Sequence, residues 1–235
     1  MKIKEALASI VFPPRCPVCD EVIHVGKDTC DDCCKKVVCI GEPVCKKCGK
    51  PLENQRREYC SDCARKQHYF SQGKAVFVYQ GEIRQSMYRF KYSNCRTYGK
   101  TFVEDVWKRH AIWLQNLSVD AVVPVPMYRK KEKRRGYNQA EVLAHGIAQK
   151  LGCPVETKLV VRAKNTVPLK SLNDTQRKKN LENAFKIRKN GVKLNKILLI
   201  DDIYTTGSTL DGVTTALLAA GVQEVYCLTI CAGQG

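Results

Sequence analysis

The stretch from Ile197 to Leu210, ILLIDDIYTTGSTL, decides the fold. An apolar run typical of a buried strand ends in two adjacent carboxylates, Asp201 and Asp202, and a hydroxyl-rich loop then leads directly into a helical pattern. In open α/β sheets ligands bind at the carboxyl ends of the strands, and the N-terminus of a helix attracts anions. The sequence therefore predicts that the loop from Thr205 to Thr209 holds a phosphate group.

The two acids indicate what carries that phosphate. Carboxylates repel a phosphate, but they suit hydroxyl donors such as a ribose diol, or a magnesium ion. The stretch from Ile197 to Leu210 itself contains neither a Gly-Lys-Ser/Thr triplet nor a Gly-x-Gly-x-x-Gly turn. An alternative is a plain helix capped by Ser208 or Thr205, but it leaves the paired acids unexplained. We predict a sugar phosphate bound by Asp201, Asp202, Thr205, Thr206, Gly207, Ser208 and Thr209.

The rest of the C-terminal region alternates between the two kinds of pattern. Strands are predicted at Lys74 to Tyr79, Asp120 to Pro126, Leu159 to Arg162, Lys196 to Ile200 and Glu224 to Cys231. Helices are predicted at Glu82 to Tyr92, Tyr98 to Leu117, Tyr137 to Leu151, Thr175 to Phe185 and Ser208 to Ala220. Such alternation predicts an α/β fold, with a mostly parallel sheet covered by helices on both faces.

The first part of the chain is rich in cysteine, and eight of the fourteen cysteines of the whole chain form four Cys-x-x-Cys pairs there. Two such pairs complete a tetrahedral zinc site, so we predict one or two structural zinc ions in a module over residues 1–70, before a second domain at 71–235. Gly49 fits a knuckle that requires a positive φ. The predicted ligands are Cys16, Cys19, Cys30, Cys33, Cys45, Cys48, Cys60 and Cys63.

Several features of this module stay open from the sequence alone. Cys34 could replace Cys33, and the pairs could be cross-braced, with the first and third pairs sharing one metal ion. One of the two sites could be empty. His24 and His68 flank the module and could also serve as ligands.

The chain is strongly basic, with a formal net charge of +17. Eight thiolates holding two zinc ions would leave it near +13. Such basicity is typical of proteins that meet nucleic acid. A loop at 129–135, RKKEKRR, and a polar loop at 162–177 supply candidates for binding pyrophosphate or DNA, although a solvated surface loop would also explain the first. The candidates are Arg129, Lys130, Lys131, Lys133, Arg134, Arg135, Arg162 and Lys164.

Two residues after the basic stretch have alternative interpretations. Tyr137 could stack on a base or pack in the core, and Asn138 could cap the following helix or donate to a ligand. The first eleven residues predict a short amphipathic helix rather than a signal peptide. Without an apolar run of membrane length, we expect a cytoplasmic protein with no membrane span.

The segment IDDIYTTGST resembles the phosphoribosyl-pyrophosphate (PRPP) motif of type I phosphoribosyltransferases. The order of the segments resembles that of the ComF family. It is the cysteine-rich start, then VPVPMYRKKEKRRGYNQ, then RAKNTVPLKSLNDTQRKKNLENAF, and last this motif. The resemblance implies that Asp201 and Asp202 hold the ribose hydroxyls at a catalytic site for PRPP with Mg²⁺. It also implies that the loop at 162–177 forms a hood over PRPP.

Two functions follow from these observations. The ComF resemblance implies a role in DNA uptake during natural transformation, with single-stranded DNA and a helicase-like partner. The alternative is an active phosphoribosyltransferase, which transfers ribose 5-phosphate from Mg-PRPP to a nitrogenous base and releases pyrophosphate. A purely structural zinc adaptor would leave the PRPP loop unexplained.

Overall fold

The computed structural model of the chain describes residues 13–24, 26–163, 184–188 and 193–234. The expected N-terminal helix, Lys164 and most of the expected helix at 175–185 lie outside these residues. No helix in the described ranges has both the length and the apolar character needed to cross a lipid bilayer.

The centre of the molecule is a four-stranded sheet whose strands all run parallel. Its order is β1-β6-β5-β2, so the two longest strands lie in the middle. This arrangement confirms the parallel sheet that the alternation of patterns predicts. The four strands are β1 (Gln72–Val78), β2 (Ala121–Pro124), β5 (Lys196–Tyr204) and β6 (Glu224–Ala232).

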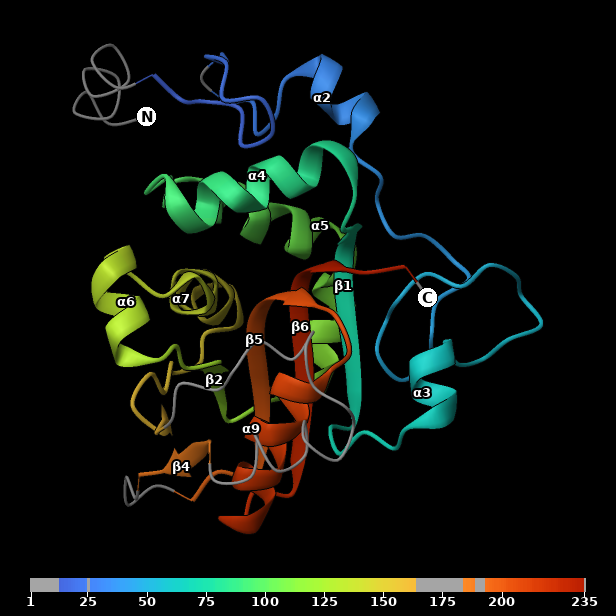
Figure 1. Cartoon of the computed structure of the whole chain (residues 1–235), viewed down its shortest axis with the longest axis vertical. Helices are drawn as coiled ribbons and strands as arrows, with labels where there is room; N and C mark the ends of the chain where they lie inside the picture. Colours follow the sequence, from blue (N-terminus) through green and yellow to red (C-terminus); the bar gives the residue numbers. More distant parts are fainter. Residues whose placement is uncertain (1–12, 25, 164–183, 189–192, 235) are drawn as a thin grey trace.

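Helices cover both faces of this sheet, as Figure 1 shows. Along β5, Ile197 and Leu199 join one buried cluster, while Leu198 and Ile200 join the other. The alternation arises because successive side chains of a strand point to opposite faces. Residues of α9 (Ser208–Ala219) belong to the first cluster. The second contains residues of α4 (Gly81–Tyr92), α5 (Tyr98–Leu117) and α7 (Gln139–Leu151).

Strand β5 extends further than the apolar run predicts. It continues through both acids to Tyr204, so Asp201 and Asp202 lie within its carboxyl end rather than after it. Asp201 pairs with Thr229 of β6 in the ladder. The ladder continues past the acids because backbone pairing with β6 does not depend on side-chain polarity.

Two segments differ from the prediction. Phe185 belongs to a strand rather than a helix, because β4 (Phe185–Ile187) pairs antiparallel with β3 (Val160–Arg162) in a small second sheet. The basic stretch is not a loop but a helix, α6 (Arg129–Arg135). Lysine, arginine and glutamate are strong helix formers, and their charges are solvated on a helix that buries no residue.

The cysteine-rich region contains two short helices, α2 (Asp31–Lys36) and α3 (Ser61–Arg65). Each begins directly after the first cysteine of a Cys-x-x-Cys pair, with Cys30 and Cys60 as the N-cap residues. A helical turn brings residues three positions apart to the same side, so both sulfurs of each pair point in one direction.

Candidate functional site

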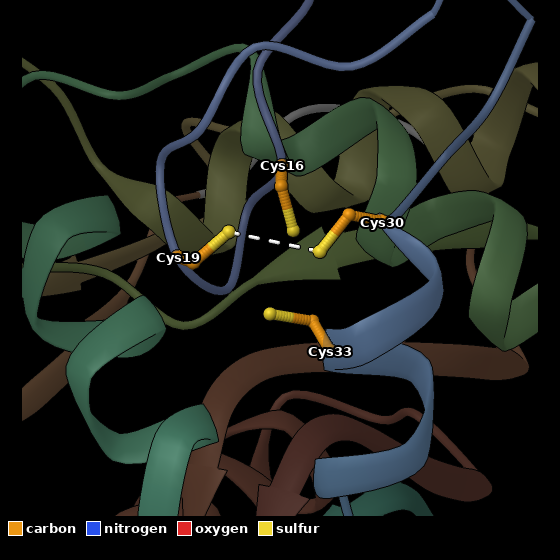
Figure 2. Close-up of side chains that lie close together, drawn as sticks. All are labelled: Cys16, Cys19, Cys30 and Cys33. Carbon is orange, nitrogen blue, oxygen red and sulfur yellow. Dashed lines mark hydrogen bonds between the residues drawn. The ribbon is translucent and has the colours of Figure 1, made fainter.

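The first four cysteines form one compact group. Their sulfurs lie within 4.8 Å of one another, and the Cys19 and Cys30 sulfurs are 3.7 Å apart. Figure 2 shows all four side chains pointing toward a common centre, two from a loop and two from the start of α2. Cys34 is exposed and is not part of the group. The group consists of Cys16, Cys19, Cys30 and Cys33.

The last four cysteines form a second group, Cys45, Cys48, Cys60 and Cys63. The pairs therefore combine in series, and the cross-braced alternative is wrong. Gly49 has φ of +76°, as the knuckle requires, and a Cβ there would lie 2.8 Å from the Gly73 carbonyl oxygen. The knuckle thus approaches the start of β1 at backbone distance.

Both groups fit zinc by their chemistry. Four thiolates in a tetrahedral arrangement are a common structural zinc site, and such a site is closed to further ligands. Within the described residues, the two metal-binding groups contain neither His24 nor His68. His68 instead lies with its Nδ1 2.9 Å from a carboxylate oxygen of Asp211.

The predicted phosphate loop lies between β5 and α9. Gly207 is the N-cap residue of α9, with φ of +72°, and no side chain caps the helix. The alternative in which Ser208 or Thr205 caps it is therefore wrong. The Thr206 and Ser208 hydroxyls are 3.0 Å apart, within reach of a shared acceptor. An uncapped N-terminus with neighbouring hydroxyls is suited to an anion such as phosphate.

The two acids differ in their surroundings. Burial raises the pKa of Asp201 to about 7, and the charge of Asp202 adds to this effect. Asp202 forms an ion pair with Lys91 of α4, at 3.1 Å. Burial alone would lower the pKa of Lys91, but the Asp202 carboxylate outweighs burial and the pKa is raised. Lys91 could not be predicted from the sequence, because no motif near it in the chain identifies it as part of this site.

The charges of Arg162, in β3, and of Asp201 act on each other. Burial lowers the pKa of the Arg162 guanidinium, and the charge of Asp201 opposes that shift. The charge of Arg162 also adds to the effect of burial in lowering the pKa of Lys131. Arg162 is thus close enough to both Asp201 and α6 to act on their charges.

A cluster of buried polar side chains packs against Gly207 of the phosphate loop. A Cβ at Gly207 would lie 2.6 Å from the Tyr204 hydroxyl and 2.8 Å from Cε1 of His68. Asp211, in the first turn of α9, accepts from His68 and from Lys66 Nζ at 2.7 Å. Sequence reasoning missed this function for His68 and Asp211, which lie 143 positions apart in the chain.

The predicted basic residues of α6 are exposed except Arg135, which is half-buried. Arg135 donates to Gln139 and lies over the ring of Tyr92. A cleft of about 430 Å³ is lined by Arg129, Glu132, Lys133 and Gly136.

Tyr137 and Asn138, which each had two alternative interpretations, both have structural roles. Tyr137 is buried against Phe90, so the packing interpretation is supported. Asn138 caps α7 by accepting from the Ala140 N–H, and it donates to the Val125 carbonyl.

Comparison with known proteins identifies both parts of the chain. The model of the double zinc ribbon domain matches residues 7–64, and that of the phosphoribosyl transferase domain matches residues 138–235. Competence protein F of Haemophilus influenzae is 30% identical over 177 residues, which cover 72% of this chain and 76% of that protein. The chain belongs to the ComF family.

Other relatives of this ComF protein carry related names. Competence protein ComFC of Bacillus subtilis is 27% identical over 69% of this chain and 67% of its own length. DNA utilization protein YhgH of Salmonella typhi is 34% identical, but the match spans only 46% of this chain and 48% of that protein. An adenine phosphoribosyltransferase structure has a TM-score of 0.39 at 14% identity, covering 70% of this chain and 82% of that chain.

The matched domains and the observed sheet together define the architecture of this ComF protein. It is a type I phosphoribosyltransferase-like α/β fold preceded by a double zinc ribbon with two four-cysteine sites.

Proposed function

We propose that this ComF protein acts in DNA uptake or DNA use, and that it binds PRPP or another ribose 5-phosphate at residues 201–209. The supporting observation is the acidic pair at the carboxyl end of β5, followed directly by the uncapped start of α9. The loop donates backbone N–H groups and hydroxyls to the 5′-phosphate. Asp201 and Asp202 accept hydrogen bonds from the ribose hydroxyls.

Lys91 and Arg162 complete the pocket in this proposal. Lys91 neutralises Asp202 until a ligand arrives, and the ribose diol then competes for that carboxylate. The acids are also the oxygen donors here that suit a magnesium ion bound together with PRPP, and the metal would screen charge on the pyrophosphate. We propose Arg162 and Lys131, which act on each other's charge, as cations that meet that pyrophosphate, and the effect of the Asp201 charge on Arg162 supports this.

Single-stranded DNA is the second ligand of the proposal. Relatives are named competence and DNA utilization proteins, and α6 carries six cations that could contact a phosphate backbone. In this role the protein would work in the cytoplasm and receive incoming DNA with a helicase-like partner.

Calorimetry with PRPP and magnesium tests the pocket. The wild-type protein is expected to bind, and the double variant Asp201→Asn/Asp202→Asn to lose binding while still binding DNA. The control is Asp120→Asn, just before β2, because the Asp120 carboxylate accepts from the backbone at the other end of β5. Equal PRPP affinity in wild type and double variant would overturn the proposal.

An active phosphoribosyltransferase is the alternative. The matched phosphoribosyl transferase domain and the pKa of Asp201 near 7 favour it, because such a carboxyl can exchange a proton at neutral pH. The chemistry would transfer ribose 5-phosphate to a nitrogenous base and release pyrophosphate, mainly through positioning and charge stabilisation. Pyrophosphate release on mixing Mg-PRPP with a panel of bases distinguishes an enzyme from a protein that only binds.

A further inference from the structure

Helix α4 carries an exposed pair of aromatic rings. Tyr88 and Tyr92 are 59% and 57% exposed, in a helix whose other side is buried in the core. They are four residues apart, so they share one side of the helix, and their ring centroids are 4.9 Å apart at an angle of 44°. Single exposed tyrosines are common, but here two large apolar surfaces adjoin each other and face solvent.

A cation from α6 lies over one ring of this pair. The guanidinium of Arg135 lies 4.7 Å from the centroid of the Tyr92 ring. Arg96, just beyond α4, lies over Tyr137 and donates to the Gly136 carbonyl, so it joins α4 to the end of α6. The rings therefore adjoin a helix with six cations and one glutamate.

The pair is also continuous with the proposed sugar-phosphate pocket. Lys91, the residue before Tyr92, forms the ion pair with Asp202. Figure 1 shows α4 crossing the end of the sheet toward which β1 runs, with α6 near one end of α4. A ligand lying along α4 and α6 would thus lead to the acidic pair.

We propose that Tyr88, Tyr92 and Arg135 form a stacking platform for the unpaired bases of single-stranded DNA, beside a phosphate track along α6. Aromatic rings bind unpaired bases of any sequence through their faces, and neighbouring cations bind the backbone. A duplex keeps its bases stacked inside and leaves the rings without partners. The inference rests on the proposed DNA binding and names the surface that performs it.

The test separates the bases from the backbone. Fluorescence anisotropy measures the affinity of the full chain for a short oligothymidylate and for an abasic oligomer with the same backbone and length. Wild type is expected to bind the oligothymidylate about tenfold or more tightly than the abasic oligomer. The double variant Tyr88→Ala/Tyr92→Ala is expected to bind both equally, near the abasic value.

Two further variants control for folding and for ring chemistry. Tyr88→Phe/Tyr92→Phe keeps both ring faces and should retain the wild-type preference. Tyr59→Ala removes a ring that is 46% exposed in the segment between Cys48 and Cys60, and it should change nothing. Thermal unfolding of every variant shows whether the fold is kept.

The outcomes distinguish this inference from the function on which it rests. If wild type binds neither oligomer, the proposed DNA binding itself is wrong. If wild type binds DNA and the double alanine variant keeps the preference for bases, DNA binding stands and the platform is overturned. Equal binding of both oligomers by wild type would also overturn the platform, because it would show that only the backbone is bound.

Discussion

Asp201 combines burial with a neighbouring like charge. Both effects disfavour its ionised form, and its pKa lies near 7 rather than near 4. The folded state therefore binds this proton more tightly than the unfolded chain does. Between about pH 4 and pH 7, this group makes folding less favourable as the pH rises.

Replacing this acid should consequently stabilise the protein in a pH-dependent way. Without added magnesium, Asp201→Asn is expected to raise the free energy of unfolding at pH 8 by more than about 1 kcal/mol. The gain should shrink toward pH 5, where the wild-type carboxyl is protonated. Urea unfolding of both proteins across this range measures it, and a gain independent of pH would contradict the account.

Gly207 is restricted by both backbone and space. Its φ is +72°, and a Cβ would meet the Tyr204 hydroxyl and the His68 ring. Gly207→Ala is expected to lower the free energy of unfolding by about 1–3 kcal/mol and to weaken PRPP binding. Gly221→Ala is the matched control, because Gly221 has φ of +99° with nothing near its Cβ.

Gly221→Ala should lower the free energy of unfolding by about 1 kcal/mol, because it only strains the backbone, and it should leave PRPP affinity unchanged. Chemical unfolding and calorimetry compare the two variants. Equal losses in both would show that the Tyr204 hydroxyl and the His68 ring leave room for a Cβ at position 207.

At the level of single residues, the sequence predicts those site residues that belong to a local motif. The eight cysteines that form the two groups were identified, because the Cys-x-x-Cys spacing marks each pair. Lys91 and His68 were not, because each meets its acidic partner only through tertiary packing. A buried histidine and a buried lysine have no local pattern that distinguishes them from other histidines and lysines.

Helix α6 shows that a run of charged residues can form a helix that the hydrophobic pattern does not predict. Seven polar residues without an apolar stripe predict a loop, since helices in globular proteins usually bury one face. The segment is helical all the same, and Gly136, with φ of +85°, ends it. The alternation of apolar runs elsewhere predicted the four sheet strands and the helices that cover them, because each of those elements buries a face.

Neutralising cations of α6 should weaken DNA binding and make that binding less dependent on salt concentration. The triple variant Lys130→Gln/Lys133→Gln/Arg134→Gln keeps strong helix formers while removing three exposed charges. The slope of log affinity against log salt for single-stranded DNA is expected to fall by about 2. The exposed pair Lys35 and Lys36 of α2, changed to glutamine, gives the control. An unchanged slope in the triple variant would exclude α6 from the DNA contact.

The two four-cysteine groups are integrated differently into the whole molecule. Cys45, Cys48 and Cys60 belong to the same buried cluster as α9 and one face of the sheet. Among the residues that the structure describes, Cys16 and Cys33 form a small cluster with Val18 and Ile23 as its further buried members. The second zinc ribbon is therefore expected to unfold together with the sheet. The boundary near residue 70, placed by composition, stays a prediction.

Single ligand changes should reveal this difference. Cys48→Ser and Cys19→Ser are each expected to remove one zinc ion, measured by atomic absorption. Only Cys48→Ser should lower the melting temperature of the main transition strongly, since it disrupts the shared core. Similar melting temperatures for the two variants would show that the sheet does not depend on the second zinc ribbon.

The central claim concerns one pocket, where the end of β5 supplies two acids and the start of α9 supplies phosphate donors. A crystal structure of the full chain with Mg-PRPP tests it most directly. The account predicts the 5′-phosphate against the backbone of residues 205–209 and the ribose hydroxyls against Asp201 and Asp202. PRPP bound elsewhere, or a loop that blocks this position in saturating ligand, would contradict it.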